Sequence, residues 1–122
     1  MQSDFILYIA LNYFRVARFA RIKYKLSVNC LLVLSGVYVY SKVINQSFTR
    51  RQVTYFTRYF DSYRINKYFT VLNNLGYIVE SGKKREFQLY SISLIGVKII
   101  EEMKESYDIN INEFIRKYNI SL

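Results

Sequence analysis

The chain has 122 residues and a mass of 14.7 kDa, which is enough for one domain with one modest hydrophobic core. Hydrophobic residues make up 52% of the sequence and charged residues 22%, as in ordinary globular proteins, which argues against disorder and fibrous repeats. The sequence contains no histidine and a single cysteine, Cys30, which excludes an intrachain disulfide and a zinc site built from Cys and His ligands. We expect Cys30 to be a buried thiol without a chemical role.

The charge is strongly positive and unevenly distributed. Lys and Arg number 18 against 9 Asp and Glu, and the net charge of +9 indicates a polyanionic partner, either nucleic acid or an anionic membrane surface. Residues 5–85 contain 14 basic and 2 acidic side chains, a balance of +12, whereas residues 86–122 contain 4 basic and 6 acidic ones, a balance of −2. We therefore expect the binding surface in the first two thirds of the chain.

Export and membrane insertion are not indicated. The opening Met-Gln-Ser-Asp lacks the basic lead and small-residue cleavage site of a signal peptide. The longest uncharged run, residues 26–41, has 16 residues and contains Ser27, Asn29, Ser35 and Gly36, so it falls short of the roughly 20 apolar residues that span a bilayer. We expect a cytoplasmic protein without a membrane partner, in which this run is a core helix.

The first predicted helix covers residues 5–22 and is amphipathic. Its inward face is expected to contain Phe5, Ile9, Phe14, Ala17 and Ala20 or Ile22. On another side, basic residues follow one another at steps of three and four: Arg15, Arg18, Arg21 and Lys25. We expect this stripe to form salt bridges with Glu101, Glu102 and Glu105, while contact with the DNA backbone or with a membrane are the alternatives.

The next predicted helix begins at Ser27, whose side chain can cap it, and runs to about Asn45 with Val28, Leu31 and Val39 at helical spacing. A third, short helix is predicted from the capping box of Thr49 and Gln52, in which each side chain can satisfy the other residue's backbone N–H. It runs through Val53 and Phe56 and ends before Asp61 and Ser62, either of which can cap a fourth helix.

The fourth predicted helix has one apolar and one polar face. Ile65, Phe69, Leu72 and Leu75 are expected to face inward, and Arg64, Asn66, Lys67, Thr70 and Asn73 to face solvent. Gly76 ends this helix as a C-terminal glycine cap. We expect Phe56 and Phe87 to be buried with Phe69, so that most aromatic residues serve core packing rather than stacking on single-stranded nucleic acid.

A β-hairpin is predicted after Gly76. One strand begins at residues 77–79. It is followed by a turn of Ser81 and Gly82 with Lys83, Lys84 and Arg85, which gives the hairpin a basic tip, and by a second strand over about residues 87–92. A fifth helix capped by Ser93 is predicted to place Leu94, Val97, Ile100 and Met103 inward, followed by a separate short helix marked by Ile111, Phe114, Ile115 and Tyr118.

This order resembles the winged helix-turn-helix of MarR-type bacterial transcription regulators over residues 26–103, with PadR-type regulators a close second. The resemblance rests on five parts of the sequence: Leu26-Ser27, Phe48-Thr49-Arg50-Arg51-Gln52, Asn74-Leu75-Gly76-Tyr77-Ile78, Arg85 on the wing, and Tyr90-Ser91-Ile92-Ser93-Leu94-Ile95-Gly96. The last of these is similar to the family's strand that leads into a "Leu-Thr-x-x-Gly" helix start. It implies a homodimer held by its first and last helices, a pseudo-palindromic operator and, in many members, release by a small-molecule effector.

We therefore expect an α+β, mostly α-helical fold: a winged helix-turn-helix with flanking N- and C-terminal helices, in one domain over residues 1–122. The helix-turn-helix covers about residues 49–75, the wing about 77–93, and the dimerisation helices about 4–22 and 94–120. Both flanking helices have more apolar surface than one small domain can cover, which favours a homodimer.

The candidate DNA-binding residues are Arg50, Arg51, Ser62, Tyr63, Arg64, Asn66, Lys67, Thr70, Lys83, Lys84 and Arg85. Arg64 and Asn66 are the candidates for base contacts, because Arg and Asn form bidentate hydrogen bonds with guanine and adenine in the major groove. Arg50, Arg51, Ser62 and Lys67 are assigned to phosphates, and the three wing cations to the minor groove or its edge.

We expect no enzymatic activity, cofactor or metal, because histidine, cysteine pairs and a glycine-rich phosphate loop are all absent from the sequence. The predicted function is a sequence-specific regulator that binds double-stranded DNA as a homodimer, most simply a repressor. The alternatives are an accessory DNA-binding protein of a mobile element and a winged helix that contacts an acidic protein.

Overall fold

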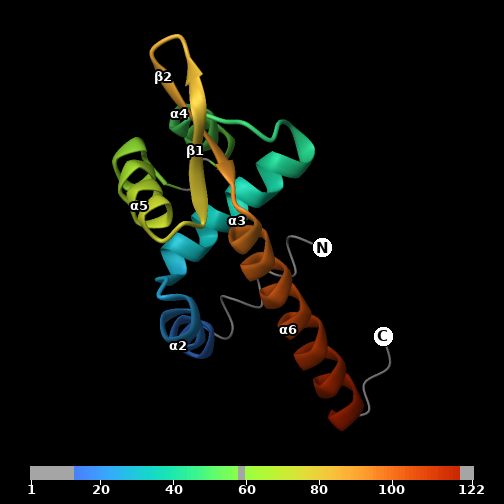
Figure 1. The fold of residues 1–122 in the computed structure, drawn as a ribbon. Helices are drawn as coiled ribbons and strands as arrows, with labels where there is room; N and C mark the ends of the chain where they lie inside the picture. Colours follow the sequence, from blue (N-terminus) through green and yellow to red (C-terminus); the bar gives the residue numbers. More distant parts are fainter. Residues whose placement is uncertain (1–12, 58–59, 119–122) are drawn as a thin grey trace.

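The computed structural model describes the backbone of residues 13–57 and 60–118, and the side chains of residues 17–57, 60–106 and 116. The elements follow one another as α2 (Tyr13–Tyr24), α3 (Val28–Val43), α4 (Arg50–Thr57), α5 (Ser62–Asn74), β1 (Ile78–Lys84), β2 (Phe87–Ile92) and α6 (Leu94–Tyr118), as Figure 1 shows. This arrangement confirms the predicted α+β, mostly helical winged helix-turn-helix. The predicted inward residues Phe5, Ile9 and Phe14 lie outside the described side chains.

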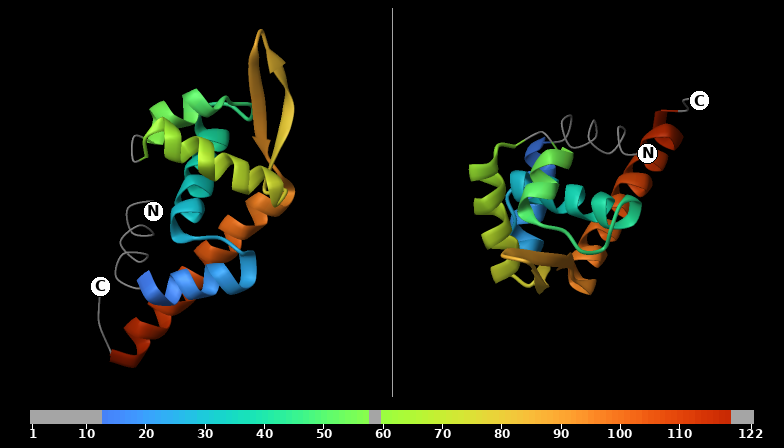
Figure 2. Two further views of the ribbon diagram at one scale, coloured as in Figure 1. Left: turned by 90° about the vertical axis from the view of Figure 1, so that its left-hand side faces the viewer. Right: turned by 90° about the horizontal axis from the view of Figure 1, so that it is seen from above.

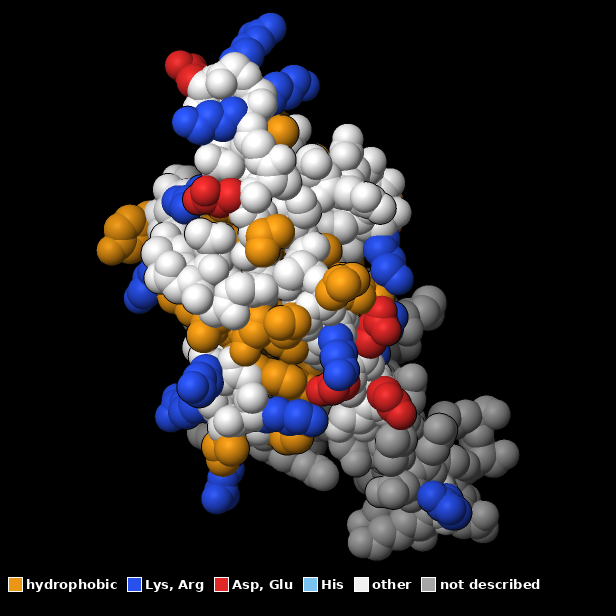
Figure 3. Space-filling model, in the orientation of Figure 1, with side chains coloured by type: hydrophobic (Ala, Val, Ile, Leu, Met, Phe, Trp, Pro, Cys, Tyr) orange, Lys and Arg blue, Asp and Glu red, His pale blue; other side chains and the backbone are white. Residues whose placement is uncertain are grey.

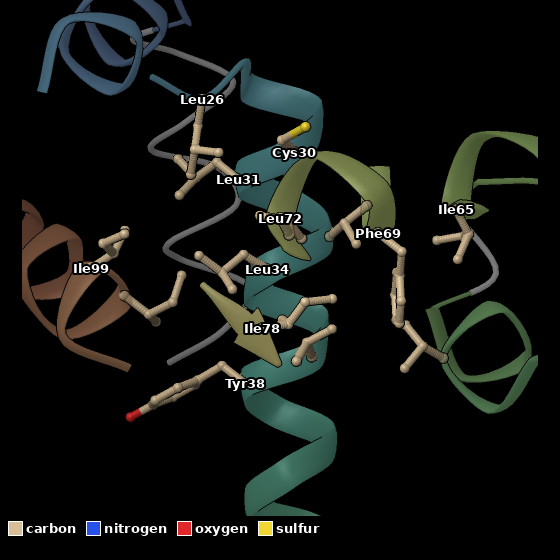
Figure 4. Packing of buried hydrophobic residues seen from close by; sticks show 14 of the residues in the cluster. Leu26, Cys30, Leu31, Leu34, Tyr38, Ile65, Phe69, Leu72, Ile78 and Ile99 are labelled. Carbon is tan, nitrogen blue, oxygen red and sulfur yellow. The ribbon is translucent and has the colours of Figure 1, made fainter. Parts of the chain in front are cut away.

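Helix α3 lies at the centre of the domain. It begins at the Ser27 cap, whose side chain accepts a hydrogen bond from the Cys30 N–H at 3.2 Å. In Figure 4 its buried side chains, Leu31 and Leu34 among them, face Phe69 and Leu72 of α5 and Ile99 of α6. As predicted, most of the uncharged run 26–41 lies in this core helix and Cys30 is a buried free thiol.

Local sequence fixes both ends of the helix-turn-helix. Before α4, the Thr49 Oγ1 accepts from the Gln52 N–H at 3.1 Å and the Gln52 Oε1 accepts from the Thr49 N–H at 2.9 Å, which confirms the predicted capping box. Before α5, the cap is Asp61 rather than Ser62, because the Asp61 carboxylate accepts from the Arg64 N–H at 2.9 Å. The helix ends before Gly76, which has a φ of +79°.

The turn of the wing is shorter than predicted, because β1 continues through most of the expected turn residues. Lys83 and Lys84 belong to β1, where they pair with Gln88 and Phe87, and the tight turn lies at Arg85, which has a φ of +58°. Gly82 is not the turn but the site of a register shift after Glu80, and its φ of +139° suits a β-bulge. The two β-strands therefore extend to the cationic tip.

One isolated bridge attaches the wing to the helix-turn-helix. The Phe48 N–H donates to the Tyr90 carbonyl at 3.0 Å, and the Tyr90 N–H donates to the Phe48 carbonyl at 2.8 Å. The rings of Phe48 and Tyr90 both meet Phe69 of α5 edge to face. Strand β2, the segment directly before α4 and helix α5 thus share one buried aromatic cluster.

The C-terminal region is one helix of 25 residues, so the prediction of two separate helices was wrong. No glycine or proline follows Gly96, and nothing in the sequence therefore forces a break. Leu94 was also wrongly placed inward, since it is 89% exposed, whereas Ile100 and Met103 are buried as predicted. Figures 1 and 2 show the end of α6 extending away from the rest of the domain.

Helix α2 is held against α6 by a different residue from those predicted. The salt bridge joins Lys23 Nζ and Glu102 Oε2 at 3.3 Å; among the described side chains, neither Arg18 nor Arg21 makes an ion pair. The Tyr24 hydroxyl donates to the same carboxylate at 2.5 Å. Burial and this hydrogen bond raise the pKa of Tyr24, while the Tyr24 hydrogen bond and Lys23 lower the pKa of Glu102.

Two phenylalanines that were predicted to be buried are not: Phe56 is 38% exposed and Phe87 is 46% exposed. Ile22 points outward as well, and Ala20 takes the buried position on α2.

None of the described helices is by itself long and apolar enough to cross a membrane. Residues 17–24 and α3, taken together across a bend of 78°, satisfy the requirements of length and composition.

Candidate nucleic-acid interface

Helix α5 presents a polar face to solvent. The predicted site residues on this helix are all exposed: Ser62, Tyr63, Arg64, Asn66, Lys67 and Thr70. Tyr63 is 77% exposed, although it is a large aromatic side chain. On the opposite side Ile65, Phe69 and Leu72 are completely buried, so that the helix is fixed from behind and its outer face is free of core contacts.

The structure separates the two predicted base-reading residues. Residues two apart in a helix point about 200° away from each other, so Arg64 and Asn66 lie on opposite flanks of α5. The Asn66 flank faces α4 and the wing. The Arg64 flank is followed along the helix by Tyr68, whose hydroxyl accepts from Asn29 Nδ2 at the start of α3 at 3.1 Å. Tyr63, Lys67 and Thr70 occupy the outermost stripe between the flanks.

Two shallow grooves connect α5, α4 and the wing. The first brings together the α5 residues Ser62 and Asn66, Arg51 of α4 and residues 86–88 of the wing. The second is lined by Arg51, Lys84 and Arg85, together with Thr49, Gln52 and Phe87. Because Arg51 borders both grooves, the start of α5 and the wing tip belong to one continuous surface.

Arg50 contributes to this surface from a half-buried position. Its Nε donates to the Tyr90 hydroxyl at 3.1 Å, and its guanidinium carbon is 5.4 Å from the centre of the Tyr90 ring and 5.8 Å from that of Phe69. Its guanidinium therefore fastens α4 to β2, whereas the neighbouring Arg51 is exposed. Arg50 thus has a structural role that the sequence analysis did not foresee.

The wing tip is cationic. Lys83, Lys84 and Arg85 are all exposed, and Figure 3 shows Lys and Arg side chains gathered at the end of the hairpin, where Glu86 is the nearest acidic residue in sequence. Among the described residues, no group of three or more Cys, Asp or Glu side chains is placed to hold a metal ion.

Sequence reasoning missed several residues that line the grooves: Thr49, Gln52, Phe87 and Gln88. Thr49 and Gln52 were predicted only as capping residues. Their position directly beside Arg50 and Arg51 in the sequence is the signal that could have placed them on the same surface as these arginines. Gln88 Nε2 donates to the Gly82 carbonyl at 2.7 Å and so stiffens the wing at its bulge. Phe87 was expected inside the core, and no sequence pattern indicated its exposure.

No protein-family model matches the sequence, and no curated protein matches it either. Solved structures do match. MepR, a transcription regulator of the Staphylococcus aureus multidrug efflux pump MepA, is 11% identical with a TM-score of 0.70, covering 99% of this chain and 85% of that one. A mutant of MarR from Escherichia coli is 12% identical with a TM-score of 0.66, covering 95% and 82%.

A third similar structure is a MepR mutant from S. aureus bound to an oligodeoxyribonucleotide, which is 10% identical with a TM-score of 0.71 and covers 99% of this chain and 85% of that one. The match extends over the helix-turn-helix, the wing and the flanking helices, because it includes almost the whole chain. This chain has the fold of the MarR-type winged helix regulators.

Proposed function

We propose that this protein is a transcription regulator that binds double-stranded DNA in a sequence-specific manner and has no enzymatic activity. The observation that carries the proposal is the continuous surface formed by the exposed face of α5, Arg51 and the wing cations Lys84 and Arg85. A convex polar helix beside a cationic hairpin matches a major groove and its neighbouring minor groove. The similarity to a MepR structure bound to an oligodeoxyribonucleotide supports the same partner.

Helix α5 is the proposed reading element. Arg64 and Asn66 lie on opposite flanks of its first two turns, so each is assigned to base edges on a different side of the major groove, with Tyr63 and Thr70 between them. Ser62, Lys67 and Arg51 are assigned to phosphates that border the groove. Arg50, which is already bonded to Tyr90, holds α4 in place and adds positive charge.

The wing is the proposed second contact. Its antiparallel strands extend to Lys84 and Phe87, so Lys83, Lys84 and Arg85 stand at the end of a rigid hairpin. Cationic side chains in this position favour the minor groove, where the negative potential is strongest when the groove is narrow.

We further propose that the protein acts as a homodimer and represses transcription by occupying a promoter in the cytoplasm. With 25 residues, α6 is about 37 Å long, and among its described side chains, the buried contacts with the core lie in the first three turns, at Ile99, Ile100 and Met103. The remainder extends beyond the domain, where its sequence carries Ile111, Phe114 and other apolar residues suited to a partner helix.

The proposal is tested by selecting fragments from sheared genomic DNA with the purified protein at roughly physiological salt, where non-specific binding is weak. Enrichment of an inverted repeat is expected. A single asymmetric site would favour an accessory DNA protein of a mobile element, and failure to bind DNA even at low salt would favour a winged helix that contacts an acidic protein.

A further inference from the structure

A second group of exposed cations lies on α2 and directly after its end, apart from the wing. Arg18 and Arg21 are about one turn apart on α2, and Lys25 follows directly after Tyr24, the last residue of the helix; all three are exposed. We call these three residues the α2 strip. Figure 3 shows Lys and Arg side chains gathered over α2 as well as at the wing tip. The two groups lie at different ends of the domain.

The charge of the α2 strip is not neutralised within the described part of the chain. The salt bridge from α2 to α6 uses Lys23, which lies on a different side of the helix. Asp61 is the only acidic residue between positions 13 and 79, and its carboxylate caps α5. Neighbouring like charges such as these repel one another. A polyanion bound across all three side chains would offset this repulsion, so the strip favours a polyanionic partner.

Lys25 ends α2 as a left-handed C-terminal cap. Its φ is +60°, the Lys25 N–H donates to the Arg21 carbonyl at 3.1 Å, and the Leu26 N–H donates to the Ala20 carbonyl at 3.2 Å. These two hydrogen bonds fix the backbone of Lys25 next to the last turn of α2.

The α2 strip is continuous with the proposed reading helix. The start of α3, directly after Lys25, is bound to α5 through the hydrogen bond between Asn29 and Tyr68. Figures 1 and 2 both place α5 between the wing tip and α2. Cations therefore flank the reading helix on two sides.

We infer that the α2 strip is a second phosphate-binding surface, which extends the contact with duplex DNA past α5 on the side away from the wing. This inference rests on the proposed function. The strip would contact the phosphate backbone of the same duplex and would add affinity without sequence preference, because it offers charge but no groove-reading helix.

The test is a salt titration of binding between the full chain and a mixed-sequence duplex of roughly 30 base pairs, about three helical turns. The strip variant is Arg21→Gln/Lys25→Gln, and the matched control Lys98→Gln/Lys104→Gln removes two exposed lysines of α6 and the same net charge. The slope of log affinity against log salt is expected to fall by about 2 units in the strip variant and to stay unchanged in the control. Equal melting temperatures would show that both variants are folded.

If the wild-type protein binds the duplex and the two variants have equal slopes, the inference is wrong and the proposed function stands. If the wild-type protein does not bind the duplex at low salt, the proposed function fails and the inference fails with it. Ile22 lies close to these cations in sequence and is 71% exposed, so an anionic membrane is the main alternative to DNA as the partner of the strip. Weaker binding of the strip variant to vesicles containing phosphatidylserine, with unchanged DNA binding, would assign the strip to lipid and overturn the inference.

Discussion

Arg50 Nε donates a hydrogen bond of 3.1 Å to the Tyr90 hydroxyl, so that the first residue of α4 is fastened to the second strand of the wing. The same guanidinium lies over the rings of Tyr90 and Phe69. Together with the backbone bridge between Phe48 and Tyr90, this contact fixes the wing relative to the recognition helix. A fixed spacing between these two elements is what simultaneous contact with adjacent grooves requires.

We expect Arg50→Ala to lower the free energy of unfolding by about 1–3 kcal/mol, because it removes a charge-assisted hydrogen bond and two cation–π contacts from a half-buried site. Urea denaturation measures this change. The neighbouring Arg51→Ala is the matched control, since Arg51 is exposed and its loss should change stability by less than about 0.5 kcal/mol while weakening DNA binding. Equal stability of the two variants would show that the Arg50 contacts contribute little.

The attachment of α2 to α6 should depend on pH. Because the pKa of Glu102 in the folded state lies below its ordinary value of 4.5, the ionised carboxylate stabilises the fold above that pH, and this contribution is lost as the pH falls through the folded-state pKa. Wild type should therefore exceed Glu102→Gln in stability by a constant amount near pH 7, and by less below pH 4.5. Denaturation curves at several pH values measure the difference, with Glu101→Gln as control; a difference independent of pH would contradict the assignment.

Gly96→Ala should be far more destabilising than Gly76→Ala. A Cβ at position 96 would lie 2.3 Å from the Tyr77 carbonyl oxygen, and a backbone atom cannot rotate away, so we expect a loss of about 3 kcal/mol. At Gly76 the space is open and only the φ of +79° is unfavourable, which suggests a loss of about 1 kcal/mol. Thermal melts of the two variants decide the order, and the reverse order would contradict the packing of α6 on the wing.

Base reading and phosphate contact can be separated by two substitutions. Arg64→Ala should relax sequence preference at one base position of the selected site, whereas Lys83→Ala should weaken binding to all sequences alike and reduce the salt slope by about 1 unit. Binding measured on a set of single-base variants of the site distinguishes the two effects. Uniform losses for both substitutions would remove Arg64 from the base-reading residues.

Much of the fold follows from local sequence. The caps of α3 and α4 and the glycine after α5 could be identified because their hydrogen bonds connect residues close in the chain. The exposed face of α5 was also predicted correctly, since helical spacing alone determines which side chains share a face.

The remaining features depend on contacts that sequence spacing does not encode. Gly82 looks like a turn residue, but pairing across the hairpin makes it a bulge and moves the turn to Arg85. Lys23 rather than the arginine stripe meets Glu102, because the rotation of α2 is set by packing of Ala20 and Tyr24. The role of Arg50 depends on Tyr90, 40 residues away in the chain.

In the proposed function, α5 and the wing recognise a DNA sequence. The most direct test of this recognition compares the affinity of the full chain for a genomic fragment obtained by selection with its affinity for a duplex of the same length and composition in scrambled order, at roughly physiological salt. We expect the selected fragment to bind at least about 1,000 times more tightly. Equal affinities for the two duplexes would contradict sequence-specific recognition.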